Sequence, residues 1–254
     1  MRPERTWKRA ARDAAPVAFV LAICPIVAAM APGPAVPVAR ATRLIGVERS
    51  LDTFFEPAVH NWVAARPLLM RLADFGYATI HLPVMLGVLA WVWFARPSAF
   101  RLVRNTFVLA QALIVAGYVL VPTAPPRLVP SIGYDGAIGP ASSGLDRLAM
   151  SPYAAMPSGH AAFAVIAATA VVCLARNPLV RLAAALYPLA VLLEIVATGN
   201  HIWLDAAAGV AAAAVAFAVI GATDDGTRRA WRERWLAARS SRRSGEVVSD
   251  ASPG

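Results

Sequence analysis

Long apolar stretches separated by short polar segments run through most of the 254-residue chain. Several of them approach the roughly 20 apolar residues that a helix needs to cross a bilayer. The pattern predicts six membrane-spanning helices, at residues 14–31, 77–95, 105–121, 161–175, 182–198 and 202–222. The fourth is short, and we expect it to begin near Met156. The sequence therefore predicts an all-α polytopic membrane protein, folded as a six-transmembrane-helix bundle.

The segment before the second predicted span, residues 32–76, carries an amphipathic pattern. Its apolar residues recur at helical spacing between Leu51 and Trp62. Polar residues lie between them or beside them, namely Glu48, Asp52, Glu56 and Asn61. This pattern is typical of a helix in the outer membrane interface, and Pro57 either kinks it or begins its second half. We favour a helix that covers the bundle over one that binds substrate.

The composition agrees with a membrane protein. Hydrophobic residues make up 58% of the chain and charged residues 15%, against about a quarter charged in soluble domains. The net charge of +9 would suggest nucleic-acid binding in a soluble protein. With both termini in the cytoplasm, however, most basic residues fall in cytoplasmic segments, as the positive-inside rule describes. We therefore expect a multi-pass protein of the cell membrane, with membrane lipids and no nucleic acid as partners.

Three parts follow from this topology. Residues 1–13 form a basic cytoplasmic leader, residues 14–222 the membrane domain, and residues 223–254 a basic cytoplasmic tail. In the tail, Trp231 and Trp235 lie among arginines and predict a helix on the anionic inner leaflet, followed by a disordered end. The first apolar run also resembles a signal peptide, but its length favours a retained helix.

Polar residues gather where two of the apolar runs begin. The two stretches are Pro157–His160 and Asn200–Asp205. The predicted topology places both, together with Arg127, at the extracytoplasmic ends of their helices. Polar groups at a membrane boundary are costly unless they are paired or functional, so this end of the bundle is the candidate site.

The residue types at this end suit phosphoryl transfer. His201 and Asp205 lie four residues apart and are predicted to share a helix face. The carboxylate then fixes the tautomer of the imidazole and leaves the other nitrogen free to attack phosphorus. His160, expected to face His201, is able to protonate the leaving oxygen. A zinc site made of the same three residues is the less favoured alternative, because no supporting ligand spacing accompanies it.

Three further residues are candidates for binding phosphate. Ser158 and Asn200 are able to cap their helices, whose free N–H groups bind anions. Arg127 offers a planar fork of donors to phosphate oxygens. Taken singly, each has a simpler interpretation, as a helix cap or as an interfacial anchor. Taken together with the histidines, they are hard to assign to stability alone.

At these residues the chain resembles the type 2 phosphatidic acid phosphatase superfamily, membrane enzymes that cleave lipid phosphates through a phosphohistidine without a metal or other cofactor. Pro157–His160 resembles the PSGH motif of that family, and His201 with Asp205 resembles the H-x3-D end of its third motif. The resemblance implies that His201 is the nucleophile, Asp205 its orienting residue and His160 the acid. It also implies that Ser158 and Gly159 contact phosphate.

The chain departs from the family pattern at two places. The first motif, K-x6-RP, is absent and Arg127 lies in its place, while Glu194 and Ile195 stand where the third motif has Ser and Arg. These departures resemble the branch that includes inositol phosphorylceramide synthases, as do residues 76–81 and 197–201. We expect supporting roles behind the catalytic groups for three residues, namely Tyr77, His81 and Glu194.

The sequence thus predicts a lipid phosphate phosphatase or phosphotransferase that works through a phosphohistidine at the outer face of the membrane. Water as acceptor gives hydrolysis, and an alcohol gives transfer, for example inositol-phosphate-type transfer to a lipid alcohol. The alternative of another class is a non-enzymatic membrane protein or transporter. Against it, the polar residues gather at one side of the bilayer, with the exception of Glu194. The expected partner is a lipid phosphate substrate, and no oligomeric state is predicted.

Overall fold

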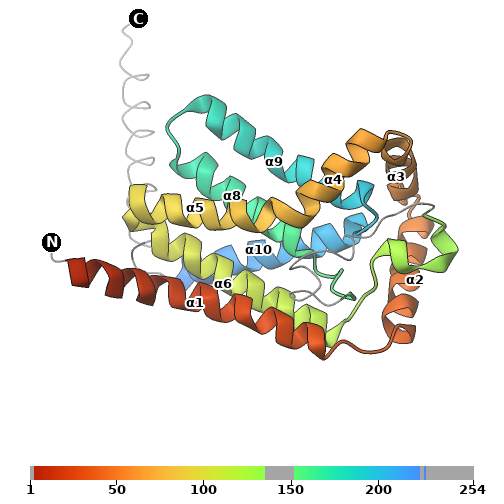
Figure 1. Cartoon of the computed structure of the whole chain (residues 1–254), viewed down its shortest axis with the longest axis horizontal. Coiled ribbons are helices and arrows are strands. Elements are labelled where there is room, and N and C mark those ends of the chain that lie inside the picture. The colour runs from red at the N-terminus through yellow and green to blue at the C-terminus, as the bar shows by residue number, and fades with distance from the viewer. Residues whose placement is uncertain (1–2, 135–151, 224–225, 227–254) are drawn as a thin grey trace, which may run out of the picture.

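The computed structural model describes residues 3–134, 152–223 and 226, which form a bundle of helices (Figure 1). The α-helices are α1 (Pro3–Ala29), α2 (Ala35–Ser50), α3 (Glu56–Ala64), α4 (Pro67–Thr79), α5 (His81–Ala95), α6 (Pro97–Leu120), α8 (Gly159–Leu174), α9 (Pro178–Ala197) and α10 (Trp203–Thr223). Two 3-10 turns, η1 (Pro126–Leu128) and η2 (Pro130–Ile132), follow α6. No strand forms within the described ranges, which confirms the all-α class.

Four of these helices are long and apolar enough to cross a membrane: α1 from Trp7 onward, α6, α9 and α10. A fifth span results if α4 and α5, which are bent by 49° at the break between them, are counted as one. The 16 residues of α8 correspond to about 24 Å of helix, less than the roughly 30 Å of a hydrocarbon core. The predicted number of six spans is therefore not confirmed, although each predicted apolar run contains a helix.

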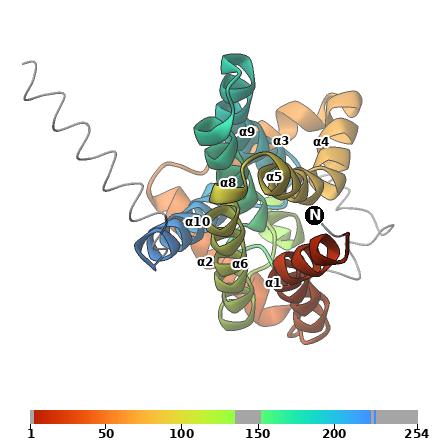
Figure 2. The same cartoon turned by 90° about the vertical axis from the view of Figure 1, so that its left-hand side faces the viewer.

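Helix α8 lies at the centre of the bundle, between α5, α6, α9 and α10 (Figure 2). Ala162, Ala164 and Ile166 are fully buried there. Its apolar sequence is therefore explained by contact with neighbouring helices, which its many alanines allow to approach closely. This helix begins before the predicted run at residue 161, as expected, although not as early as Met156. It begins at Gly159, because the preceding residue has an extended backbone and acts as the N-cap.

Two predicted boundaries are wrong. The span predicted at 77–95 is interrupted, because α4 ends at Thr79 and α5 begins at His81. The span predicted from residue 105 begins at Pro97, since proline is well suited to the first turn of a helix. Arg101 and Arg104 thus lie on α6, and Arg104 pairs with Asp13 of α1 at 3.2 Å.

The outer segment, residues 32–76, folds into α2, α3 and α4 instead of a single interfacial helix. Pro57 lies in the first turn of α3, so it begins the second half of the segment, one of the two predicted alternatives. Large apolar side chains are exposed along these helices, among them Val47, Leu51, Phe55, Trp62, Leu68, Leu72 and Phe75. The polar face predicted here is wrong at Glu48 and Glu56, which are both 0% exposed. The apolar side chains face outward, and the two acids face the bundle.

The two ends of the bundle differ in chemistry. At one end, Arg96 donates from Nε to the carbonyl of Leu174 at 3.1 Å, and Arg104 pairs with Asp13. The opposite end, at the right in Figure 1, holds α2, α3 and the turns that lead into α8 and α10. The candidate site therefore lies at the end away from these arginines.

Parts of the predicted organisation fall outside the described residues. These are the tail helix with Trp231 and Trp235, the expected disorder after it, and residues 135–151 of the long segment before α8. The predicted leader, residues 1–13, joins the first span without a break from Pro3 onward, as part of α1.

Candidate active site

Four aromatic rings meet at this end of the bundle, from Tyr77, His81, His160 and His201. His160 lies among the other three. Its ring stacks on Tyr77 with 4.2 Å between centroids, meets His81 edge-on at 5.1 Å and lies 5.9 Å from His201. These residues come from α4, α5, α8 and the turn before α10. The fold thus brings together the two imidazoles that were expected to share one site.

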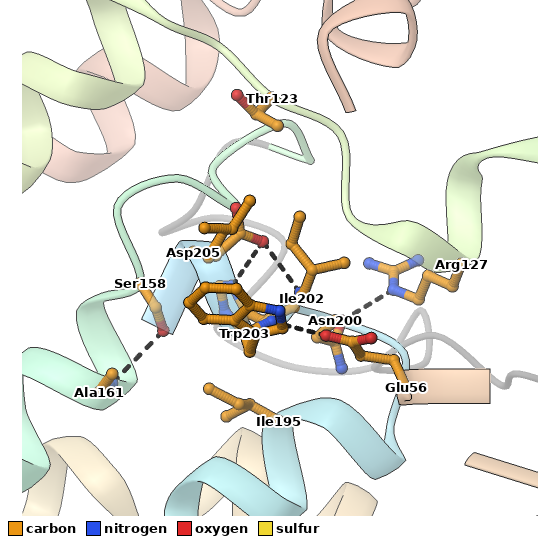
Figure 3. A network of polar contacts seen from close by, with 12 residues as sticks. Glu56, Thr123, Arg127, Ser158, Ala161, Ile195, Asn200, Ile202, Trp203 and Asp205 are labelled. Atoms are coloured by element: carbon orange, nitrogen blue, oxygen red, sulfur yellow. Dashed lines mark hydrogen bonds and ion pairs between the residues drawn. The ribbon is translucent and has the colours of Figure 1, made fainter. Parts of the chain in front are cut away.

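The Pro157–His160 segment is fixed by the helices on either side of it. Ser158 Oγ accepts the N–H of Ala161 at 3.4 Å, which confirms the predicted cap (Figure 3). The backbone N–H of Ser158 donates to the carbonyl of Asp205 at 2.9 Å. On α10, Gly209 faces the Ser158 carbonyl so closely that a Cβ there would collide with it. The start of α8 is thereby joined directly to the start of α10.

His201 lies in the turn between α9 and α10. Gly199, with φ of 66°, ends α9, and the N–H of His201 donates to the carbonyl of Ile195 at 3.1 Å. The expectation that His201 and Asp205 lie on one helix is therefore wrong. The turn nevertheless brings His201 Nδ1 to 3.5 Å from Asp205 Oδ2, and both side chains are 2% exposed or less.

The Asp205 carboxylate is also held by backbone. Its Oδ2 accepts the N–H of Ile202 at 3.2 Å, an interaction that corresponds to half of a capping box (Figure 3). The distance to His201 is longer than a strong hydrogen bond to a carboxylate, and contacts of this kind commonly tighten when substrate binds. The arrangement places a fixed negative charge beside one ring nitrogen.

Asn200 orients Arg127 and does not cap α10, contrary to the prediction. Arg127 Nε donates to Asn200 Oδ1 at 2.8 Å (Figure 3). Asn200 Nδ2 donates to Thr198 Oγ1 at 2.9 Å. The backbone N–H of Arg127 donates to the carbonyl of Gly199 at 3.0 Å. Burial lowers the pKa of Arg127 from its ordinary value, yet a guanidinium remains charged at physiological pH. The cation is thus fixed to the turn that carries His201.

The start of α10 is occupied by carboxyl groups from the outer segment. Glu56 Oε1 accepts the N–H of Trp203 at 2.8 Å, and Glu48 Oε1 accepts that of Leu204 at 3.1 Å. Together with Asp205, they satisfy the first N–H groups of the helix. The N–H groups of Trp203 and Leu204 are therefore not free to bind phosphate, contrary to the expectation for this helix end. No role was predicted for these two glutamates, and the available signal was the presence of two acids among apolar positions.

His81 is held at both ring nitrogens. Its Nε2 lies 2.6 Å from Glu194 Oε2, and its Nδ1 lies 2.9 Å from the hydroxyl of Tyr187. The backbone of Gly76 on α4 packs directly against the Glu194 carboxylate. His81, Tyr187 and Glu194 line a cavity of about 290 Å³ between α4, α5 and α9. Two of the three predicted supporting residues thus form a pair beside His160, and Tyr187 was missed.

Gly159 faces α6, where a Cβ would lie 3.4 Å from the hydroxyl of Tyr118. The donor geometry of the described residues does not favour metal binding. Among the described residues, no group of three or more His, Cys, Asp or Glu side chains is arranged to hold a metal ion. The zinc alternative built on His160, His201 and Asp205 therefore gains no support from the arrangement of its ligands.

The sequence profile of the PAP2 superfamily matches residues 42–219, more than half of the chain, and this range contains every residue of the ring cluster. The chain belongs to the PAP2 superfamily. No curated protein and no solved structure matches it. Membership in the PAP2 superfamily indicates a membrane phosphatase or phosphotransferase. The apolar helices of this family member are compatible with a membrane location.

Proposed function

We propose that the chain is a lipid phosphate phosphatase or phosphotransferase that works through a phosphohistidine on His201. One observation carries the proposal. The rings of His160 and His201 lie 5.9 Å apart, and the Asp205 carboxylate lies 3.5 Å from Nδ1 of the second ring. With Nδ1 turned toward the carboxylate, Nε2 of His201 is the nitrogen that attacks phosphorus.

In the first step, His201 Nε2 forms a bond to phosphorus while the bond from phosphorus to the leaving oxygen breaks. The electron pair of that bond stays with the leaving oxygen, which takes a proton from His160. The Asp205 carboxylate stabilises the positive charge that develops on the attacking ring. This division of roles requires one phosphoryl group to lie between the two rings, whose centroids are 5.9 Å apart.

In the second step, an acceptor oxygen attacks the phosphohistidine, and the bond from phosphorus to His201 breaks. His160, now without its proton, takes the proton of the acceptor. Water as acceptor releases phosphate, and an alcohol as acceptor carries the phosphoryl group away. The transfer of an inositol-phosphate group to a lipid alcohol, suggested by the resemblance to one branch of the family, is a reaction of the second kind.

Phosphate oxygens are bound by Arg127 and by the start of α8 in this proposal. Arg127 is oriented by Asn200, and its planar fork is suited to two phosphate oxygens at once. Ser158 and Gly159 lie at the start of α8, where the helix dipole favours an anion, although the N–H of Ser158 is already bonded to the carbonyl of Asp205. Arg127 thus takes the role of the arginine that is missing from the third motif.

We place the site at the extracytoplasmic face of the cell membrane, with both termini in the cytoplasm. The support is the separation of the two ends of the bundle. Arg96 and Arg104 lie at the end away from the histidines. Arginines flanking apolar helices mark the cytoplasmic side.

The experiment that tests the proposal is release of phosphate by the purified protein in detergent, in the presence of EDTA. The substrates are phosphatidate, a polyprenyl phosphate and a phosphoinositide. We expect release from at least one of them, a loss of at least about a thousandfold in His201→Ala, and a loss of about a hundredfold or more in Asp205→Asn. Wild-type activity in His201→Ala would end the assignment of the nucleophile, and loss of activity in EDTA would favour a metal-dependent reaction.

Two further measurements separate the steps. Substrate labelled at phosphorus should leave an acid-labile, base-stable label on the protein when the reaction is quenched, and His201→Ala should carry none. A labelled alcohol added to the same reaction distinguishes the acceptors, since it appears in a phosphorylated product only if transfer occurs.

A further inference from the structure

Helix α10 begins without a polar residue at its N-cap position. Ile202 precedes it, and the carbonyl of this residue already accepts the N–H groups of Asp205 and Ala206, at 3.1 and 3.4 Å. An isoleucine has no side-chain oxygen for the free N–H groups of the first turn. Acceptors for the buried start of this helix must therefore come from elsewhere in the fold.

Glu48 and Glu56 supply those acceptors. They come from α2 and α3, which otherwise expose apolar side chains at the edge of the bundle. Both glutamates are 0% exposed, and their Oε1 atoms accept the N–H groups of Trp203 and Leu204 at 2.8 and 3.1 Å. Carboxyl groups are also favoured at the positive end of a helix dipole. Two helices at the periphery thus determine where α10 begins.

We propose that Glu48 and Glu56 are positioning residues, which hold the first turn of α10 and thereby keep His201 and Asp205 opposite His160. The proposal rests on the proposed function for its kinetic consequences. Neither glutamate takes part in the bond changes described above. Their effect passes through the backbone, because the two N–H groups that they bind belong to the residues just before Asp205 and just after the turn that carries His201.

The consequence for catalysis is a loss of turnover. A displacement of about 1 Å of a reacting group is able to cost on the order of a hundredfold in rate. The glutamates bind the N–H groups of Trp203 and Leu204 and make no hydrogen bond to Arg127 or to the start of α8, which bind phosphate in our proposal and are joined to the glutamates only indirectly, through the turn before α10 and through Asp205. Loss of a glutamate should therefore lower kcat and leave KM nearly unchanged.

The test compares variants of the full chain, purified in detergent and assayed with the lipid phosphate on which the wild type is most active. We expect Glu56→Ala and Glu48→Ala each to lower kcat by about 10- to 100-fold, with KM changed by less than about threefold. Glu56→Gln keeps an oxygen that accepts the Trp203 N–H, so its kcat should lie within about threefold of the wild-type value.

The matched control is Thr53→Val. Thr53 Oγ1 accepts the indole N–H of Trp203 at 3.2 Å and donates to the carbonyl of Glu48 at 3.2 Å. The variant removes both contacts, but the Thr53 N–H still donates to the Glu48 carbonyl at 2.9 Å, and both carboxyl groups that accept the α10 N–H groups stay in place. Its kcat should stay within about twofold of wild type. Wild-type kcat in both alanine variants would overturn the proposal, as would a Glu56→Gln variant as slow as Glu56→Ala.

A second readout does not depend on activity. Hydrogen–deuterium exchange at the amides of Trp203 and Leu204 should be at least tenfold faster in the alanine variants and unchanged in Glu56→Gln and Thr53→Val. If the wild type cleaves no lipid phosphate, the proposed function fails, whereas the exchange rates still decide the positioning role. If Glu56→Ala does not fold, Glu56→Asp, whose oxygen is withdrawn by one methylene, should show the same acceleration, and unchanged exchange would overturn the proposal.

Discussion

His81 and Glu194 lie in close contact directly behind His160, with 2.6 Å between Nε2 and Oε2. The His81 ring meets the His160 ring edge-on, with 5.1 Å between their centroids. Glu194 thus fixes the orientation of a ring that packs against the proposed acid. An acidic residue at this depth, where the third motif of the family has a serine, is explained by this pairing.

Replacing Glu194 by glutamine should lower kcat by about tenfold, because a hydrogen bond to a charged group contributes about 1.5–3 kcal/mol and only part of it acts through His81 on the reaction. Tyr187→Phe, which removes only the contact at the other nitrogen of His81, should have a smaller effect. Steady-state kinetics of the three proteins decide this, and equal kcat for Glu194→Gln and wild type would contradict it.

The backbone of Gly76 also packs against the Glu194 carboxylate. Alanine at position 76 would place a methyl group on the Glu194 carboxylate, whereas alanine at Gly87 of α5 meets nothing within 4 Å. Gly76→Ala should therefore reproduce the loss of kcat seen in Glu194→Gln, and Gly87→Ala should remain at the wild-type value. A Gly76→Ala variant with full activity would show that the position of Glu194 does not matter.

The close approach of α10 to Ser158 makes Gly209 a sensitive position. Alanine there would collide with the Ser158 carbonyl, and overpacking of this kind costs about 1–3 kcal/mol. We expect Gly209→Ala to lower the thermal unfolding midpoint and to reduce kcat at least about tenfold, since the start of α8 carries His160 and the turn before α10 carries His201.

Gly221 on the same helix is the control for this variant, because a Cβ there meets nothing within 4 Å. Gly221→Ala should keep wild-type kcat and gain up to about 1 kcal/mol from helix propensity. Equal unfolding midpoints and equal kcat for the two alanine variants would mean that the contact at Gly209 is unimportant.

The stability of the protein should depend on the protonation of Glu48. Burial raises the pKa of Glu48 from 4.5 to about 8, and the nearby Glu56 and Asp205 carboxylates add to the effect. Between these two pH values the folded protein keeps a proton that the unfolded chain releases. The free energy of unfolding should therefore fall as the pH rises from about 4.5 to 8, and change little from this group above that range.

Glu48→Gln should remove this contribution. The measurement is the thermal unfolding midpoint between pH 5 and pH 9, taken as the difference between wild type and variant. Asp52→Asn, which changes an exposed acid of the same segment, should follow the wild type. Parallel curves for wild type and Glu48→Gln would show that Glu48 does not titrate in this range.

Arg127→Ala should reduce kcat/KM by about 10- to 100-fold, because charge-assisted hydrogen bonds to phosphate contribute about 1.5–3 kcal/mol. Arg127→Lys keeps the charge but loses the planar fork and the bond to Asn200, so it should recover only part of the loss. Arg40→Ala is the control, since Arg40 donates to the backbone carbonyls of Leu120 and Pro122. A similar kcat/KM for Arg127→Ala and Arg40→Ala would remove Arg127 from the phosphate site.

Much of the candidate site was predictable because its residues lie in short local motifs. Ser158 followed by an apolar run predicted the cap of α8, and the spacing of His201 and Asp205 predicted their proximity. Glu48 and Glu56 were not predictable in this way. Their partners lie about 150 residues further along the chain, and no local pattern shows which helix end a distant carboxylate will reach.

The sequence by itself determined the all-α class, which apolar runs contain helices and which residue types are able to carry out phosphoryl transfer. These properties depend on composition and periodicity, which act over one or two helical turns. Only the tertiary structure decided which helices and helix ends lie next to one another. It placed α8 in the centre, put His81 and Glu194 behind His160, and assigned the start of α10 to two glutamates. The reason is that buried hydrogen bonds and close helix contacts are satisfied between elements, and such pairings are specified by the whole packing of the chain.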